Sequence, residues 1–349
     1  MRHRTPGSRR SDRKGHDRIE GRRQTGESMN YIEVENLCKS FTVRRKREKG
    51  HLFREKTTVQ ALDHVSFSVR QGELVGYIGP NGAGKSTTVK ILSGILTPSS
   101  GSVHVGGRVP WTDRKAHAQH IGVVFGQRSQ LWWDVPILDS YLLLRDIYRL
   151  EENAWKTRLD ELTEKLQLGE LLRTPLRQLS LGQRMRAELC GSLLHRPELL
   201  FLDEPTIGLD AVSKLSLRDF LREENRDHRT TILLTTHDME DVAALCSRVM
   251  VLGHGNLLFD GGLTDLLSRY DRERVIEVSY ERETVLSGLP DGCTVTQTGS
   301  RYRVVYDPEN VSTAWLLEYL QGAGSIRELT AQGQNIDQLI AQMYREMDL

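Results

Sequence analysis

The sequence lacks any apolar run long enough to cross a membrane. The longest runs, such as residues 199–202 and 232–234, fall far short of the roughly 20 apolar residues that a spanning helix needs. If this chain serves a membrane, we expect it to do so from the cytoplasmic side and through a partner. No internal repeat is evident.

Cysteine is scarce, and neither sign of charge is in excess. The four cysteines are scattered without the spacing of metal ligands, which favours reduced structural thiols in the cytosol; they are Cys38, Cys190, Cys246 and Cys293. The net charge of +1 gives no overall field that would favour nucleic acid or an acidic membrane. A chain of 349 residues with 38% hydrophobic and 27% charged residues is globular and long enough for two domains.

The first 28 residues have almost no apolar side chains and are rich in Arg and Gly. Such a segment cannot bury enough surface to offset its chain entropy, which predicts a basic, disordered tail at residues 1–28. It also lacks the apolar stretch of a secretory signal. Two alternatives stay open: an arm that binds nucleic acid or phospholipid, and a translation start at Met29, directly before the first strand.

Five short apolar runs predict a buried parallel sheet. They are rich in Val, Ile and Leu and alternate with helical segments, as strands covered on both faces do. The runs are residues 74–78, 121–125, 199–203, 232–236 and 249–252. Before them, residues 31–38 and 61–70 alternate apolar and polar, which predicts half-buried antiparallel strands. The basic stretch between these two, residues 44–56, is expected to be a solvated loop.

Two amphipathic patterns, at residues 139–150 and 153–168, interrupt the alternation of strands and helices. They predict a helical subdomain at about residues 130–196, inside a first domain of residues 29–270. A new pattern then predicts a small α+β module at residues 271–349, of the split-βαβ, ferredoxin-like kind. Its expected strands are residues 274–280, 293–298, 301–306 and 326–330, and its expected helices are residues 312–321 and 335–347.

A phosphate-binding loop follows the first strand of the predicted parallel sheet. The stretch GPNGAGKST fits G-x-x-x-x-G-K-[ST], with a strand before it and a helical segment after it. Its glycines let backbone N–H groups approach phosphate oxygens, and the helix N-terminus adds partial positive charge. Lys85 supplies a full charge to the outer phosphates, and the Ser86 hydroxyl can ligate Mg²⁺. The predicted nucleotide-binding residues here are Gly79, Pro80, Asn81, Gly82, Ala83, Gly84, Lys85, Ser86 and Thr87.

Asp203 and Glu204 stand at the end of the third apolar run. Beside the phosphate-binding loop, Asp203 would hold Mg²⁺, usually through water. Glu204 would face the γ-phosphate and orient the attacking water. Acidic pairs at strand ends are common as helix caps, so this pair alone is weak evidence for a nucleotide site. Together with Lys85 upstream, it becomes strong evidence. Together they predict hydrolysis of a nucleoside triphosphate.

The stretch between these motifs resembles the ATP-binding-cassette (ABC) family. Residues 179–183 read LSLGQ, similar to the family signature LSGGQ, with Leu181 in place of its first glycine. The resemblance covers residues 31–270. It implies an α/β fold, a P-loop NTPase of the ABC nucleotide-binding type with an antiparallel β subdomain and a helical signature subdomain. It also implies ATP and Mg²⁺ as ligands.

Three further residues take roles that the resemblance implies. Gln127, just after a strand, resembles the family's Q-loop glutamine and would contact Mg²⁺ or water and sense a membrane partner. His237 resembles the switch histidine, which acts at the γ-phosphate. Phe41 sits where the family places an aromatic that stacks on adenine. The implied catalytic residues are thus Glu204, His237 and Gln127, and the implied metal ligands are Ser86, Gln127 and Asp203.

The signature implies a second copy of the chain. Ser180, Gly182 and Gln183 lie at or just before the start of a helical pattern at residues 184–194, and a helix N-terminus with free N–H donors needs an anion. In the family, two copies pair head to tail, so that each signature caps the γ-phosphate bound by the other copy. Asp210 resembles the D-loop aspartate and also suits a helix cap. Hydrolysis would remove charge from the interface and open the dimer.

Within the family, the motif sequences resemble those of ATPase subunits of bacterial drug- or ion-exporting transporters. In these transporters, separate permease chains form the pore. The resemblance therefore implies permease partners, a location at the cytoplasmic face of the inner (plasma) membrane, and no nucleic-acid partner. Trp132 and Trp133 either pack internally or form an aromatic floor for the permease. An ABC ATPase that acts on nucleic acid or the ribosome stays open as the alternative. A small-molecule kinase is disfavoured, because LSLGQ has no use in such a reaction.

Overall fold

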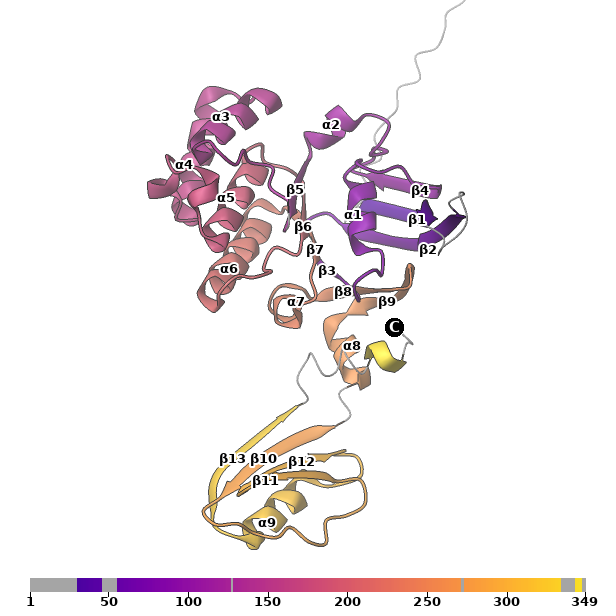
Figure 1. Ribbon diagram of the computed structural model, residues 1–349, viewed down its shortest axis with the longest axis vertical. Helices are drawn as coiled ribbons and strands as arrows, with labels where there is room; N and C mark the ends of the chain where they lie inside the picture. Colours follow the sequence, from indigo (N-terminus) through magenta and orange to yellow (C-terminus); the bar gives the residue numbers. More distant parts are fainter. Residues whose placement is uncertain (1–29, 46–54, 127, 271–272, 334–342, 347–349) are drawn as a thin grey trace, which may run out of the picture.

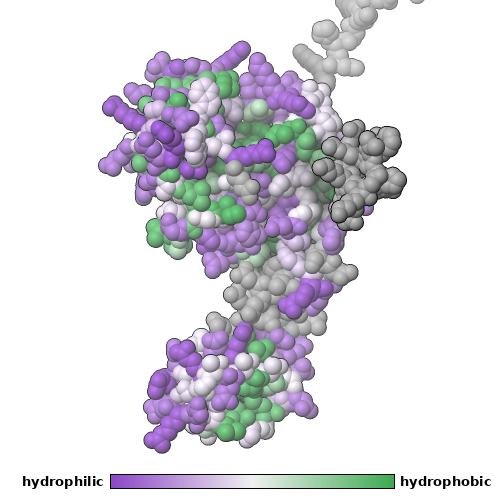
Figure 2. Space-filling view, viewed as in Figure 1, coloured by the Kyte–Doolittle hydropathy of each residue, from purple (hydrophilic) through white to green (hydrophobic). Residues whose placement is uncertain are grey.

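The computed structural model describes residues 30–45, 55–126, 128–270, 273–333 and 343–346. Figure 1 shows a large unit, in which a central sheet lies between a second sheet and a group of helices, and a smaller sheet-and-helix module beyond it. Figure 2 shows hydrophilic residues spread over the viewed face of both parts, with smaller apolar patches between them. Within the described ranges, no helix has the length and apolar character to span a bilayer.

The central sheet has six strands in the order β5-β6-β7-β3-β8-β9. All neighbours are parallel except β8 and β9, which pair antiparallel. The strands are β3 Leu74–Ile78, β5 Ile121–Phe125, β6 Leu199–Asp203, β7 Thr231–Thr235, β8 Arg248–Gly253 and β9 Asn256–Gly262. The five predicted parallel strands are therefore confirmed. The edge strand β9 was not predicted: its apolar run is only three residues long, and its residues alternate between exposed and half-buried.

The parallel strands are apolar throughout because they face two cores. Leu200 and Leu202 of β6 join a cluster with the helical side of the molecule. Leu199 and Phe201 of the same strand join a second cluster, which contains the helix α1 and the smaller three-stranded sheet. Successive side chains of a strand point to opposite faces, so covering both faces demands an unbroken apolar sequence.

The three-stranded sheet is antiparallel, in the order β2-β1-β4, with β1 Asn30–Arg45, β2 Glu55–Arg70 and β4 Ser100–Val105. The prediction of a loop over residues 44–56 was wrong at both ends of that stretch. The ladder continues through Arg44↔Lys56 to Arg45↔Glu55. Backbone hydrogen bonds need no apolar side chains, so a polar sequence does not end a hairpin whose strands are already aligned. Residues 46–54 lie outside the described residues.

The helical side of the large unit is built from α3, α4, α5 and α6. Their bounds are Ile137–Tyr148, Glu152–Lys165, Leu181–Leu193 and Ala211–His228. The remaining helices of this unit are α1 Lys85–Leu92, α2 Arg114–Ala118, α7 Met239–Leu245 and α8 Leu263–Tyr270, with short 3₁₀ turns at Gly169–Leu171 and Leu176–Gln178. The predicted helical subdomain is present. Helix α5 starts earlier than the predicted residue 184, because Ser180 caps it.

A buried ion pair joins two of these helices. The Arg158 guanidinium on α4 contacts the Glu224 carboxylate on α6 at 2.8 Å, and both side chains are 2% exposed. We expect Glu224→Ala to lower the free energy of unfolding by about 3 kcal/mol, since Arg158 would lose its buried partner and keep only Glu161, which lies 3.0 Å away and is 29% exposed. Glu223→Ala is the matched control, because Glu223 is 47% exposed and lies 3.8 Å from Lys165. Chemical denaturation measures both, and equal losses would contradict the assignment.

The C-terminal module is a four-stranded antiparallel sheet in the order β11-β12-β10-β13. Its elements are β10 Arg274–Tyr280, β11 Thr294–Thr298, β12 Arg301–Tyr306, α9 Thr313–Ala323 and β13 Ile326–Gly333. Helix α9 connects β12 to β13 and packs on the sheet through Leu316 and Leu320. The connection at residues 281–293 contains no helix. The ferredoxin-like assignment, which has a helix in both connections, therefore stays a prediction.

The last described residues return to the large unit. Residues 343–346 are helical, and Figure 1 shows this short segment beside α8 and β9. Met343 is fully buried in the same cluster as Leu263 and Leu266 of α8. The rest of the helix predicted at residues 335–347 lies mostly outside the described residues.

Candidate nucleotide site

The phosphate-binding loop links β3 to α1 and depends on its glycines. Gly79 and Gly84 have φ angles of 153° and 111°. A Cβ at Gly79 would stand 2.1 Å from the Leu252 carbonyl oxygen, and one at Gly84 would stand 2.6 Å from that of Ala61. Helix α1 begins without a side-chain cap. Its first N–H groups are therefore left as donors for an anion in the loop.

Lys85 opens α1 and its ammonium is folded into the loop. The Nζ atom donates hydrogen bonds to the carbonyl oxygens of Gly79 at 2.6 Å and Pro80 at 3.1 Å. Burial lowers the pKa of Lys85, while the nearby Glu204 and Asp203 carboxylates act in the opposite direction. The loop thus holds a cation among inward-facing backbone groups, as binding of a polyphosphate requires.

Asp203 brings its carboxylate from the end of β6 to the start of α1. Its Oδ1 atom accepts hydrogen bonds from Thr235 Oγ1 at 2.5 Å and from Ser86 Oγ at 3.3 Å. Parallel neighbours β6 and β7 end at the same edge of the sheet, which is why Asp203 and Thr235 meet. The Ser86 and Asp203 oxygens form the hard, oxygen-only ligand pair that Mg²⁺ takes in proteins. Gln127, the third predicted metal ligand, lies outside the described residues.

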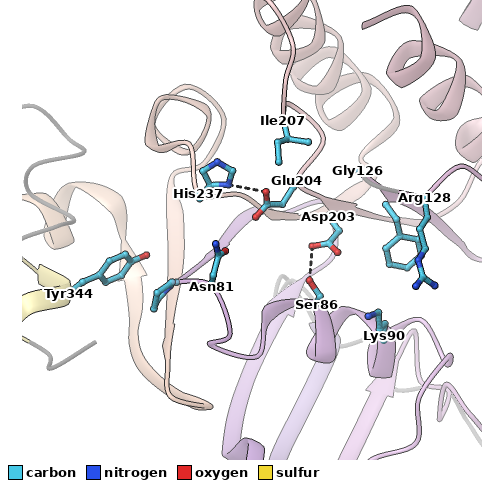
Figure 3. A pocket seen from close by; sticks show the side chains of 13 residues that line it. Asn81, Ser86, Lys90, Gly126, Arg128, Asp203, Glu204, Ile207, His237 and Tyr344 are labelled. Atoms are coloured by element: carbon cyan, nitrogen blue, oxygen red, sulfur yellow. Dashed lines mark hydrogen bonds and ion pairs between the residues drawn. The ribbon is translucent and has the colours of Figure 1, made fainter. Parts of the chain in front are cut away.

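The Glu204 and His237 side chains are in polar contact at the same edge. His237 Nδ1 lies 2.8 Å from Glu204 Oε2, and Figure 3 shows both side chains above Asp203 and Ser86. Glu204 has a φ of 57°, a left-handed conformation that costs a non-glycine residue about 1–3 kcal/mol. Its N–H donates to the Thr235 carbonyl at 2.8 Å, which holds the strained turn. The strain turns the carboxylate out of the strand direction and into the cavity.

These residues enclose a cavity of about 700 Å³. It is lined by Gly79, Pro80, Asn81, Ser86, Asp203, Glu204 and His237 from the predicted set. Gly82, Ala83, Gly84 and Lys85 form the loop between Asn81 and Ser86, and Thr87 follows half-buried in the first turn of α1. The lining residues that the sequence analysis missed are Lys90, Phe125, Gly126, Arg128, Ile207 and Tyr344. Lys90 follows the phosphate-binding loop and Arg128 follows Gln127 in the sequence. Their positive charge could have indicated a place near the phosphates.

The signature residues do not line this cavity. Ser180 and Gln183 form a reciprocal cap on α5: the Gln183 N–H donates to Ser180 Oγ at 3.2 Å, and the Ser180 N–H donates to Gln183 Oε1 at 2.9 Å. The Ser180 hydroxyl proton stays available for another acceptor. Asp210 caps α6 by accepting from the Ser213 N–H at 2.8 Å. A Cβ at Gly182 would stand 2.7 Å from Ser213 Oγ, so the two helix starts are packed together as one surface.

The model of the ABC transporter family matches residues 62–207. The chain is 31% identical to the ABC transporter ATP-binding protein NatA of Bacillus subtilis, over 65% of this chain and 90% of that protein. It is 33% identical to the linearmycin resistance ATP-binding protein LnrL of the same organism, over 64% and 71%. This chain belongs to the ABC transporter ATP-binding proteins. A solved ATP-binding subunit of an ABC transporter has the same fold, with a TM-score of 0.58 and 24% identity over 69% of this chain and 93% of that one.

The predicted ABC resemblance and α/β fold are confirmed by these similarities, and the chain is an ATP-binding ATPase. The alternative of an ABC ATPase that works on nucleic acid or the ribosome is not favoured. Of the motifs that carried the prediction, the phosphate-binding loop, the Asp203–Glu204 pair and His237 surround the cavity, and LSLGQ and Asp210 form the signature surface.

Phe41, predicted to stack on adenine, also lies outside the residues that line this cavity. It lies on β1 and is partly exposed. The Lys39 ammonium lies 5.2 Å from the centre of its ring. The ring is open to a cation–π contact on one face, and its predicted role in stacking on adenine stays a prediction.

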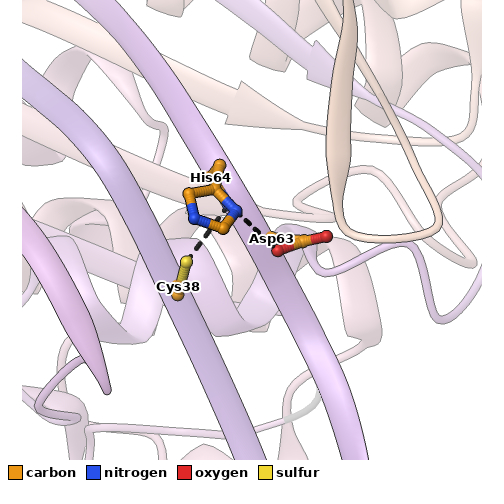
Figure 4. Close-up of side chains that lie close together, drawn as sticks. All are labelled: Cys38, Asp63 and His64. Carbon is orange, nitrogen blue, oxygen red and sulfur yellow. Dashed lines mark hydrogen bonds and ion pairs between the residues drawn. The ribbon is translucent and has the colours of Figure 1, made fainter.

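Beside Phe41 in sequence, Cys38 lies close to Asp63 and His64 (Figure 4). Each of the three offers an atom of a kind that metals take. Two contacts account for the group without an ion. The His64 N–H donates to Cys38 Sγ at 3.3 Å, and His64 Nδ1 lies 2.8 Å from Asp63 Oδ1. We therefore interpret these three side chains as a structural contact between β1 and β2.

Trp132 and Trp133 are exposed on the cassette, at 57% and 48%. The Arg184 guanidinium lies 4.3 Å from the centre of the Trp133 ring. A groove of about 280 Å³ runs between Trp133 and α5. It shares Phe125, Gly126 and Arg128 with the nucleotide cavity. Both rings are therefore about half exposed, and the groove and the cavity have a common wall.

Proposed function

We propose that this chain is the ATP-hydrolysing subunit of a transporter whose permease is formed by separate chains. Two copies bind two Mg-ATP between them and close, which moves the docked permease; hydrolysis lets the pair open again. The working site is at the cytoplasmic face of the membrane. The first domain, residues 29–270, performs this cycle, and residues 271–349 form the accessory domain.

The separation of the signature from the cavity supports this proposal most directly. The donors at the start of α5 and the Ser180 hydroxyl belong to a surface that does not line the cavity of their own copy. Exposed apolar side chains follow in the first turns of α6, whose start packs against Gly182: Val212 is 74% exposed and Leu215 is 57% exposed. Exposed apolar groups around unsatisfied helix donors suit an interface that brings an anion with it. The γ-phosphate held by a second copy fits both needs.

The charged and polar residues of the motifs divide the steps of this cycle among them. Lys85 and the α1 N–H groups hold the phosphates, and Ser86 and Asp203 hold Mg²⁺, which neutralises charge on the β- and γ-phosphates when bound. Glu204 orients the attacking water and accepts its proton. His237 holds the Glu204 carboxylate from the far side at 2.8 Å. Gln127 follows β5 and would report the state of the metal site to the permease.

The groove at Trp133 suits the permease contact. Aromatic and arginine side chains are enriched at the centre of protein interfaces. Trp132, Trp133 and Arg184 provide both kinds on one exposed surface, next to the wall of the cavity formed by Phe125, Gly126 and Arg128. A permease element seated there would feel the nucleotide through that shared wall. The name of LnrL, a resistance protein, favours export as the direction of transport.

Light scattering tests the paired-copy proposal. We expect the Glu204→Gln chain to double in mass when Mg-ATP is added, and the Glu204→Gln, Ser180→Arg chain to stay single, because the larger side chain blocks the signature surface. Thr112→Arg in the same background is the control, since Thr112 is exposed beside α2. A single chain that hydrolyses ATP at full rate at every protein concentration would overturn the proposal.

A further inference from the structure

The nucleotide cavity contains one residue from outside the ABC part of the chain. Tyr344 lines it together with Asn81, Glu204 and His237. In Figure 3 the phenol approaches from the C-terminal segment, with its oxygen end directed at the space between Asn81 and His237. This is the end of the cavity at which the γ-phosphate is expected, since Glu204 and His237 act there.

The placement of Tyr344 is fixed by its neighbour. Met343 is fully buried in the main apolar cluster, and Tyr344 is half-buried against the same cluster. Burying a methionine side chain completely stabilises the contact by about 1.5–3 kcal/mol. The segment is therefore held on the cassette by apolar contacts that do not involve the nucleotide, and the ring next to it is aimed into the cavity.

The Tyr344 hydroxyl is available as a hydrogen-bond donor. Among the described residues it has no hydrogen-bond partner. Burial raises the pKa of Tyr344 to about 12, so the phenol stays protonated at any physiological pH. A protonated hydroxyl that faces a cavity built for polyphosphate can donate to a phosphate oxygen.

We propose that Tyr344 is a nucleotide-binding residue, whose hydroxyl donates a hydrogen bond to the terminal phosphate of ATP and so couples the C-terminal segment to nucleotide state. This inference rests on the proposed function of the cavity. ATP holds residues 343–346 on the cassette more firmly than ADP does, because ADP lacks the phosphate that Tyr344 contacts. The accessory module, joined to this segment through β13, thereby receives a signal that the signature surface does not carry.

Calorimetry on the full chain tests this, with a non-hydrolysable ATP analogue and with ADP. We expect Tyr344→Phe to weaken binding of the analogue about tenfold and to leave ADP affinity within about twofold, as for loss of one bond to a charged group. Tyr319→Phe is the matched control: its hydroxyl donates to the Ser287 carbonyl at 2.7 Å inside the module. Unchanged affinity in Tyr344→Phe overturns the proposal. So does an equal loss for both nucleotides, which would show a general effect on the cavity.

Hydrogen exchange of the 343–346 amides gives a second readout. Coupling is reciprocal, so the analogue should slow this exchange more than ADP does in the native chain but not in Tyr344→Phe. Lys85→Ala separates this inference from the function it rests on. If Lys85→Ala loses binding while Tyr344→Phe matches the native chain, only the role of Tyr344 fails. If Lys85→Ala binds normally, the nucleotide site itself is misassigned.

Discussion

Glu204→Gln is expected to slow ATP hydrolysis by about 10²–10⁴-fold while ATP stays bound. The amide keeps the size of the side chain but cannot accept the proton of the attacking water. The structure supports a role at the reaction itself, because the strained φ of 57° aims this carboxylate into the cavity and His237 holds it at 2.8 Å. The lost stabilisation applies to the transition state, so the rate falls without loss of affinity.

Phosphate release under saturating Mg-ATP measures the rate, and calorimetry measures the affinity. Glu170→Gln is the control, because Glu170 is exposed in the 3₁₀ turn at Gly169–Leu171, away from the nucleotide cavity. A Glu204→Gln chain with more than a tenth of the native rate would refute the assignment. A chain that loses ATP binding as well would mean that the carboxylate serves the loop and not the water.

Lys85→Ala is expected to weaken ATP binding by at least about 10²-fold, from the loss of two charge-assisted hydrogen bonds to phosphates. The reason lies in the closed shape of the loop. The Lys85 ammonium lies over the Gly79 and Pro80 carbonyls, with little exposure to solvent. Lys85 is the one charged side chain in the loop sequence GPNGAGKST, so the phosphates would lose the positive charge that the loop itself supplies.

Thermal unfolding with and without Mg-ATP provides a direct measurement. At a ligand concentration of 100 times Kd the native chain gains about 2.7 kcal/mol of stability, and Lys85→Ala should gain almost none at that concentration. Lys115→Ala is the control, an exposed lysine of α2 outside the cavity. An equal gain in Lys85→Ala and the native chain would contradict the nucleotide site.

Much of the fold followed from local patterns. The five runs that predicted the parallel strands are apolar because each strand faces two cores. In Leu199–Leu202, successive side chains alternate between the two apolar clusters. Strand β4 escaped notice, since only Val103 and Val105 of its six residues are buried. The wrong loop at residues 44–56 has a similar cause. Pairing across the β1–β2 hairpin decided those residues, and the pattern along one strand does not record its partner.

The sequence by itself determined the chemistry of the site. The loop from Gly79 to Ser86, the Asp203–Glu204 pair and the LSLGQ signature are short motifs whose function depends on neighbours in the chain, so their residue types suffice to recognise them. The tertiary structure alone decided which of these motifs share a cavity. In the folded chain Ser180 lies away from the phosphate-binding loop, whereas Tyr344 lines the cavity. The packing of the sheet, the helices and the C-terminal segment sets these distances, and the order of residues along the chain does not encode them.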